Sequence, residues 1–189
     1  REYPDVAPGE PLPSRAAAML DAAAERIGAM AAGWLRVGFC QGNFNADNCL
    51  VSGRTMDYGP FGFVEEYEPT WGMWIHAGEH FSFMNQPRAA GVNFAMFATS
   101  LEPLLDSEGR AEVKRIIAGF DGLAEKAVGD MFARKLGFPA GSPATAALWT
   151  ELERLMRAHP TDYTIFWRQL AEAAGGEAAG AAAAAGGAR

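Results

Sequence analysis

The spacing of apolar residues is the feature that most constrains how this chain folds. From Ala16 to Trp34, apolar side chains recur every three or four positions, which places them on one face of a helix. The same spacing returns in runs that begin at Phe94, Val113, Ala124, Leu148 and Phe166. Residues 37–63 instead hold short apolar runs broken by glycines, which predicts loops and very short strands. We therefore expect an α+β fold that is mainly α.

Composition predicts three segments along the chain. Residues 1–13 carry four prolines among acidic residues, which favours an irregular lead-in, and Ser14 is the expected N-cap of the first helix. Residues 14–173 are expected to form one body, because 189 residues with 49% hydrophobic content suffice for one packed domain. Residues 174–189 are almost entirely Ala and Gly. Since repeated glycines break helices, we expect a disordered tail there.

Charge and composition argue against several classes of protein. The net charge of -7 provides no basic surface for a nucleic-acid backbone, so we expect no nucleic-acid partner. No apolar run approaches the roughly 18 residues that a membrane span needs, so we expect no membrane segment. Cys40 and Cys49 are too few for a disulfide framework or a four-cysteine zinc site. Both are predicted to be reduced, partly buried thiols.

Two short motifs carry the chemistry. Gln41-Gly42-Asn43-Phe44-Asn45-Ala46-Asp47-Asn48 is followed by Asp57-Tyr58-Gly59, and Ser52-Gly53 between them predicts a tight hairpin with residues 49–51 and 54–56 as its arms. In kinase-type sites, a catalytic-loop Asn and the Asp of a D-x-G motif bind the same cation, because magnesium prefers hard oxygen ligands. Asn48 and Asp57 fit these two roles.

The residues beside these ligands leave alternatives open. A carboxylate at Asp47 either accepts a proton from an attacking hydroxyl or assists metal binding through water. Asn43 and Gln41 stand where related small-molecule kinases have the Asp and the His of an H-G-D loop, so an ordinary kinase base is missing. Gly59 lets the backbone bend sharply after the carboxylate.

Less specific interpretations also exist for these residues. A lone Asp-Tyr-Gly tripeptide is more often a turn than a metal site, and Asp-Asn pairs are common in loops. Their conjunction on one short stretch is what favours a site. His76, His80 and His159 lack a metal-ligand spacing with carboxylates or cysteines, so we interpret them as surface or loop residues.

Three stretches together resemble the selenoprotein O family of protein adenylyltransferases: V-G-F-C-Q-G-N-F-N-A-D-N, T-M-D-Y-G-P-F-G-F and F-M-N-Q-P-R. The match spans roughly Trp34 to Leu105, and weaker similarity reaches the D-Y-T-x-F segment at Asp162–Phe166. The resemblance implies the C-lobe of a protein-kinase-like fold, with catalytic loop and D-x-G hairpin followed by a helical body. It also implies that ATP binds in an inverted orientation and that AMP is transferred to Ser, Thr or Tyr hydroxyls of protein substrates.

The resemblance also implies a role for each matching residue. Asp47 corresponds to the proton acceptor of the family, and Asn48 and Asp57 to its ligands for Mg²⁺, or for Mn²⁺ in its place. Asp57 also falls at a nucleotide-contacting position. Family members are typically mitochondrial in eukaryotes and cytoplasmic in bacteria, so the compartment expected here depends on the source.

This chain departs from the family pattern in several places. Gln41 replaces a common His, and Asn43-Phe44 replaces V-M, while the ligand positions are unchanged. The Gly-rich loop, the phosphate-binding Lys and the Arg residues of the family lie upstream, whereas the first Lys here is Lys114. The redox-active Cys or selenocysteine near the family's C-terminus also has no match. Because the chain starts at Arg1, we expect it to be part of a longer protein without its N-lobe. The alternative is a non-catalytic helical binding remnant.

Overall fold

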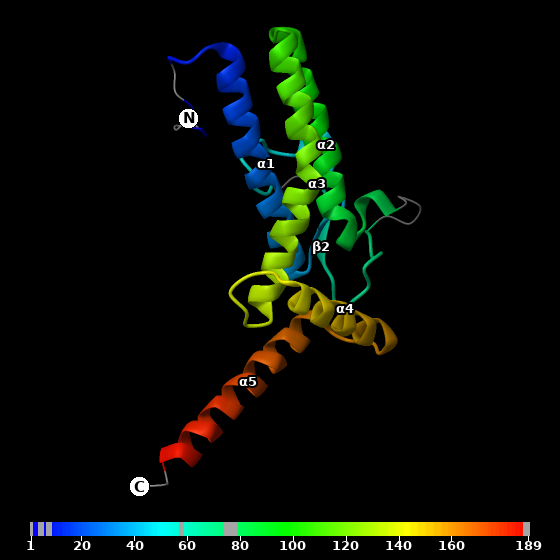
Figure 1. Cartoon of the computed structure of the whole chain (residues 1–189). Helices are drawn as coiled ribbons and strands as arrows, with labels where there is room; N and C mark the ends of the chain where they lie inside the picture. The colour runs from blue at the N-terminus through cyan, green and yellow to red at the C-terminus, as the bar shows by residue number, and fades with distance from the viewer. Residues whose placement is uncertain (1, 4–5, 7–8, 57–58, 74–78, 187–189) are drawn as a thin grey trace.

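The structure is a computed structural model that describes residues 2–3, 6, 9–56, 59–73 and 79–186, with side chains as far as residue 175 (Figure 1). The helices in these ranges are α1 (Leu12–Val37), α2 (Gln86–Ser100), α3 (Ser107–Lys135), α4 (Pro143–Ala158) and α5 (Tyr163–Gly186). The strands are β1 (Phe39–Gln41) and β2 (Phe61–Phe63). Single 3-10 turns are η1 (Ala46–Asn48), η2 (Glu79–Phe81), η3 (Phe83–Asn85) and η4 (Glu102–Leu104). The prediction of an α+β, mainly α fold is confirmed.

Helices α1, α2 and α3 pack against one another and enclose the main core (Figure 1). Alanines on the facing sides allow close approach, and larger side chains fill the space between the helices. Phe94 of α2 stacks on Phe120 of α3 with ring centroids 5.1 Å apart. The other buried members of this core include Leu20, Ala24, Ile27, Ala31, Ala89, Ala90, Val113 and Ile116. Apart from Ala89 and Ala90, which precede the run that begins at Phe94, these residues belong to the runs in which the sequence shows helical spacing.

A second core closes the end of the bundle where α4 and α5 begin. Trp149 of α4 stacks on Phe132 of α3 at a centroid distance of 3.5 Å. The buried hydroxyl of Tyr163, the first residue of α5, donates to the carbonyl oxygen of Leu35 in α1 at 2.8 Å. Asp162 caps α5 by accepting from the Ile165 N–H at 2.8 Å. The start of α5 is thus held against the ends of both long helices.

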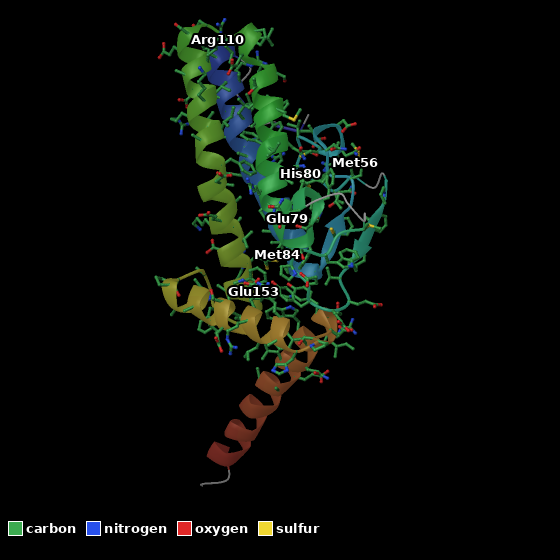
Figure 2. The ribbon with its side chains drawn as sticks, turned by 90° about the vertical axis from the view of Figure 1, so that its right-hand side faces the viewer. Met56, Glu79, His80, Met84, Arg110 and Glu153 are labelled. Atoms are coloured by element: carbon green, nitrogen blue, oxygen red, sulfur yellow. The ribbon has the colours of Figure 1, made fainter. Side chains whose placement is uncertain are left out.

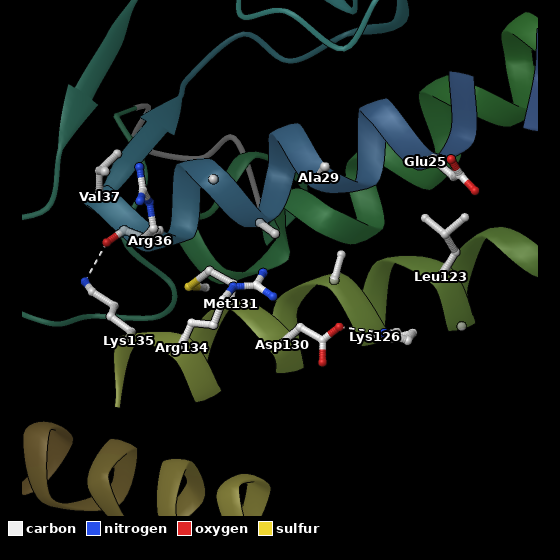
Figure 3. Close-up of a pocket in the computed structure, with 14 residues that line it drawn as sticks. Glu25, Ala29, Arg36, Val37, Leu123, Lys126, Asp130, Met131, Arg134 and Lys135 are labelled. Atoms are coloured by element: carbon white, nitrogen blue, oxygen red, sulfur yellow. Dashed lines mark hydrogen bonds and ion pairs between the residues drawn. The ribbon is translucent and has the colours of Figure 1, made fainter. Parts of the chain in front are cut away.

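The C-terminus of α1 is closed by a left-handed glycine and a lysine. Gly38 ends the helix with φ of 75°. Lys135 Nζ, from the last turn of α3, donates to the Arg36 carbonyl at 2.5 Å (Figure 3). The same amine lies 4.1 Å from the centroid of the Trp167 ring and 4.5 Å from that of Tyr163. The two rings favour the charged form. Burial, with repulsion from Arg36, is the larger effect and lowers the pKa of Lys135 to about 7.

Strands β1 and β2 pair antiparallel, with Cys40 opposite Gly62. Two further hydrogen bonds extend this pairing: Val64 N–H donates to Gly38 at 2.8 Å and Gly42 N–H donates to Pro60 at 3.0 Å. The strands therefore hold both ends of residues 42–60 together. The predicted functional motifs lie in this connection.

The predicted hairpin at Ser52-Gly53 is wrong in its arms. A turn forms there, with Gly53 N–H donating to Leu50 at 2.9 Å, but residues 49–51 and 54–56 form no strands. The turn instead lies on α1, and the Trp34 Nε1–H donates to Thr55 Oγ1 at 2.8 Å. The contact with α1 thus replaces pairing between the arms.

The ends of two helices also differ from expectation. Helix α1 begins at Leu12 with Pro11 at the N-cap, so the predicted cap at Ser14 is wrong. Proline suits the start of a helix because its missing N–H would be unpaired there.

Helix α5 runs to Gly186 and extends away from the body, whereas a disordered tail is predicted from residue 174 (Figure 1). The helix propensity of the alanines accounts for the difference.

No helix in the described ranges is long and apolar enough to span a membrane. This holds although α1, α3 and α5 contain 26, 29 and 24 residues.

We predict that Gly53→Ala destabilises the fold by about 1–3 kcal/mol. Gly53 has φ of 67°, and a Cβ atom there would lie 2.6 Å from the backbone carbon of Arg26 in α1. Urea unfolding measures the effect. Gly119→Ala is the control, because Gly119 is exposed within α3 and no atom outside its own stretch of helix lies within 4 Å of an added Cβ. It should stabilise by about 0.5–1 kcal/mol. Equal stability of Gly53→Ala and the parent would contradict the turn geometry.

We predict that the free energy of unfolding increases as pH rises from about 7 to 8.5, because Lys135 loses its proton in the folded protein. The pKa of Lys135 is about 7 in the folded protein, against about 10.5 for a lysine in the unfolded chain, so the side chain loses its proton in this range in the folded state only. The unfolded chain then binds more protons, so the free energy of unfolding increases with pH. Urea unfolding at several pH values should show a shallower slope for Lys135→Met. Lys114→Met, which changes an exposed lysine on α3, should keep the parent's slope. A parental slope in Lys135→Met would contradict the assignment.

Candidate functional site

The candidate site is built on the connection between the two strands. The site loop, residues 42–48, follows β1 directly and ends in the 3-10 turn η1. Met56, which precedes the second motif, lies on the side of the molecule that carries the strands, away from Arg110 and Glu153 (Figure 2). The loop is anchored by Phe44, whose fully buried ring meets Trp34 edge-on at a centroid distance of 4.7 Å. An apolar anchor in the middle thus fixes a polar loop to the core.

Asparagines organise the site loop from within. The carbonyl oxygen of Asn43 accepts from Asn45 N–H at 2.9 Å and from Asn48 Nδ2 at 2.8 Å. Asn43 Oδ1 also accepts from Asn45 Nδ2 at 2.8 Å. Asn43, which stands where a kinase-type loop would have its Asp, therefore acts here as an acceptor that shapes the backbone.

Asp47 and Asn48 are neighbours with different environments. Asn48 is 8% exposed, whereas the Asp47 carboxylate is exposed to solvent. Because Asn48 Nδ2 donates within the loop, its Oδ1 is the amide atom that suits a cation. An accessible carboxylate therefore adjoins a held amide oxygen, which suits the two roles predicted for them.

Two hydrogen bonds and one close approach bring the ends of the second motif's segment to β1 and the site loop. Gln41 Nε2 donates to the Met56 carbonyl at 3.0 Å, and Gly42 N–H donates to Pro60. Gly59 has φ of 89°, and a Cβ atom built there would lie 3.5 Å from both Cβ and Nδ2 of Asn43. The bend predicted at Gly59 is thus present. Asp57, predicted as metal ligand and nucleotide contact, lies with Tyr58 outside the described residues.

The donor atoms available at the loop fit a hard cation. Among the described residues, no three His, Cys, Asp or Glu side chains converge to bind a metal. Burial raises the pKa of the Cys49 thiol, next to Asn48, to about 11, so no thiolate is available near neutral pH. Amide and carboxylate oxygens remain, and magnesium accepts such a small set when phosphate oxygens and water complete its shell. The residues present therefore fit Mg²⁺ or Mn²⁺ better than zinc.

The other titratable candidates lie outside this arrangement. Cys40 and Cys49 are free thiols, and Cys40 donates to the Phe81 carbonyl at 3.3 Å. His80 packs against Phe81 with ring centroids 4.7 Å apart, and His159 is exposed. His76 lies outside the described residues.

A groove of about 1140 Å³ lies between α1 and α3, on another part of the molecule (Figure 3). Its walls carry basic and acidic side chains together, and Lys126 pairs with Asp130 at 2.6 Å. Neither Asp47 nor Asn48 lines it. The groove is therefore separate from the candidate site.

Two buried amides that hold the site loop were not predicted from sequence. Gln86 accepts from Gln41 N–H at 2.9 Å, and Asn93 Nδ2 donates to the Phe44 carbonyl at 2.8 Å. They lie seven positions apart on α2, among the apolar residues of its buried face. An amide at such a position is the signal that a polar contact is required there.

Comparison with known proteins gives a consistent family. Residues 3–184 match the family described as "Protein adenylyltransferase SelO". The chain is 35% identical over 183 residues to "Protein nucleotidyltransferase YdiU" of Chromobacterium violaceum, which covers 94% of this chain and 37% of the relative. Proteins of the same name from Mycolicibacterium paratuberculosis and Pseudarthrobacter chlorophenolicus are 37% and 33% identical. These two alignments cover 85% and 94% of this chain, and 34% and 38% of the relatives. The chain thus spans little more than a third of the relatives it matches.

Proposed function

Because this chain belongs to the SelO family of protein adenylyltransferases, we propose that it supplies the metal-binding and proton-accepting part of an AMP-transferring enzyme. In the proposed reaction, a Ser, Thr or Tyr hydroxyl of a protein attacks the α-phosphorus of ATP, and pyrophosphate leaves. The observation that carries the proposal is a pair of hydrogen bonds: Gln41, at the end of β1, donates to Met56, and Gly42, at the start of the site loop, donates to Pro60. It joins two motifs whose separate occurrence would mean little.

In the proposed mechanism, Asp47 accepts the proton of the attacking hydroxyl. Its carboxylate is exposed, so an acceptor protein can reach it, and its position in η1 is fixed by the hydrogen bonds around Asn43. General-base assistance of this kind typically contributes about 10²- to 10⁴-fold to a rate. Asn48, which is buried, and Asp57 are the residues proposed to hold the cation.

Mg²⁺, when bound, would neutralise phosphate charge and help align the α-phosphorus. The amide oxygen of Asn48 and the carboxylate of Asp57 are the residues proposed to hold it, and Asp57 would also contact the nucleotide. Transfers of this type depend chiefly on positioning and electrostatics. That agrees with a loop organised by backbone-directed hydrogen bonds, in which Asn43 replaces an ordinary kinase base.

We further propose that the fold is the C-lobe of a protein-kinase-like protein. The support is the order of its parts: a long helix, a strand, a polar loop, a D-x-G segment, a pairing strand and then a helical body. The N-lobe would supply the Gly-rich loop and the phosphate-binding Lys that the resemblance implies.

The test uses the intact protein with α-labelled ATP, Mg²⁺ and protein acceptors. We expect label to transfer to protein hydroxyls, Asp57→Ala to abolish the transfer, and Asp47→Asn to lower its rate by about 100-fold or more. Asp121→Asn, which changes an exposed carboxylate on α3, is the matched control and should leave the rate unchanged.

Absence of label transfer by the intact parent protein would refute the proposal and favour a non-catalytic remnant of the fold. Full activity of Asp47→Asn would instead refute the role of that carboxylate alone.

A second experiment separates metal binding from transfer by measuring the binding of Mn²⁺ with nucleotide by electron paramagnetic resonance. Asp47→Asn should retain this binding if Asp47 accepts the proton, whereas loss of binding would assign Asp47 to the metal.

A further inference from the structure

The F-M-N-Q-P-R motif contributes no atom to the proposed chemistry, yet it contains the most connected buried amide described here. Gln86, at the start of α2, is 1% exposed. Its Oε1 accepts from Gln41 N–H at 2.9 Å, and its Nε2 donates to the carbonyls of Phe39 at 2.8 Å and Phe83 at 3.1 Å. The amide oxygen and both N–H groups of the side chain are therefore hydrogen-bonded, and two of these three bonds are made with β1.

The register of the sheet explains this geometry. The pairs Gly42–Pro60 and Gly38–Val64 are hydrogen-bonded, so the alternation of an antiparallel ladder makes Cys40–Gly62 the next hydrogen-bonded pair. The N–H of Gln41 and the carbonyl of Phe39 then point away from β2. Gln86 meets both groups, as the backbone of a third strand would.

Asn93 repeats the arrangement two helical turns later. It is 3% exposed, and its Nδ2 donates to the Phe44 carbonyl at 2.8 Å. Helix α2 is thus hydrogen-bonded to the chain on both sides of Gly42 and Asn43. Gln86 bonds to the strand before these two residues, and Asn93 bonds to the residue after them. Ala90 and Phe94, beside Asn93 on α2, are fully buried, so this amide lies in an apolar environment.

Gln41 connects α2 to the residue that precedes the second motif. The backbone N–H of Gln41 is held by Gln86, and its side chain donates to the Met56 carbonyl, one residue before Asp57. Gln41 is itself 1% exposed. A chain of buried amides therefore connects α2 to both segments that carry the proposed ligands.

We propose that Gln86 and Asn93 are positioning residues that fix the site loop and, through Gln41, the backbone before Asp57. This inference rests on the proposed function for its catalytic consequence. Groups that orient metal ligands typically affect metal affinity or activity by about 10- to 100-fold when removed, although they touch no substrate.

The kinetic test compares Asn93→Leu and Gln86→Met with the parent in the intact protein. We expect kcat for AMP transfer to fall by about 10- to 100-fold and the Mn²⁺ requirement to rise, with KM for ATP at saturating metal within about threefold. Asn85→Leu is the control, because Asn85 Nδ2 donates to His80 at 3.2 Å and makes no hydrogen bond to the site loop. It should leave kcat and the Mn²⁺ requirement unchanged.

Hydrogen exchange tests the inference without catalysis. Asn45 and Asn48 N–H groups donate within the loop, at 2.9 and 3.0 Å. In the nucleotide-free protein they should exchange about tenfold faster in Asn93→Leu and at the parental rate in Asn85→Leu. Parental exchange and parental kcat in both α2 variants would overturn the inference. If the parent transfers no AMP, the proposed function fails, and the exchange rates still decide whether α2 holds the loop.

Two isosteric variants separate loss of the donor from a change in side-chain size. Asn93→Asp and Gln86→Glu keep the size of the side chain but remove the donor to Phe44 or to Phe39. Val113→Ala, which changes a buried residue near the start of α3, should provide a destabilised protein that keeps the hydrogen bonds of Gln86 and Asn93. The inference requires lower kcat in the isosteric variants than in Val113→Ala at equal folded fraction. An equal kcat would show that the amides serve stability alone.

Discussion

The packing of α1 against α3 is the contact on which the rest of the structure depends. Leu20 and Ile27 of α1 are buried in the core that α1 shares with α2 and α3, and the end of α1 leads through Gly38 directly into β1. The position of the site loop is therefore set by a long helix whose face is buried along most of its length. The turn around Gly53 returns to this helix, so α1 supports the connection between the strands at two separate places.

The helical part of the fold could be predicted because its signal is local. Apolar residues at helical spacing mark the buried face of α1 and most of α3. The paired strands could not be identified in the same way, since β1 and β2 have three residues each and pair across a connection of 19 residues. A turn signal at Ser52-Gly53 was present, but the fold uses that turn to contact α1 rather than to pair its arms. Long-range contacts of this kind leave no local pattern.

The candidate site was partly predictable for the same reason. Asp47 and Asn48 belong to one short motif, and their contrast in burial follows from consecutive positions in a 3-10 turn. The order of the motifs predicts that the two segments approach each other. In the structure, the Gln41 side chain donates to the Met56 carbonyl and the Gly42 N–H donates to Pro60. Gln86 and Asn93 were missed because their partners lie more than 40 residues away along the chain. Helical spacing identifies a buried face but does not say which polar groups that face must satisfy.

The side chain of Gln86 also affects how the small sheet meets other molecules. An open strand edge is a template on which another extended chain can pair, and proteins commonly protect such edges from edge-to-edge aggregation. On β1, the outward N–H of Gln41 and the outward carbonyl of Phe39 are both occupied by one amide from α2. Helix α2 thus covers that edge, and one of its residues pairs with the strand in place of a third strand. Loss of the amide would leave two buried backbone groups without a partner as well as loosen the loop.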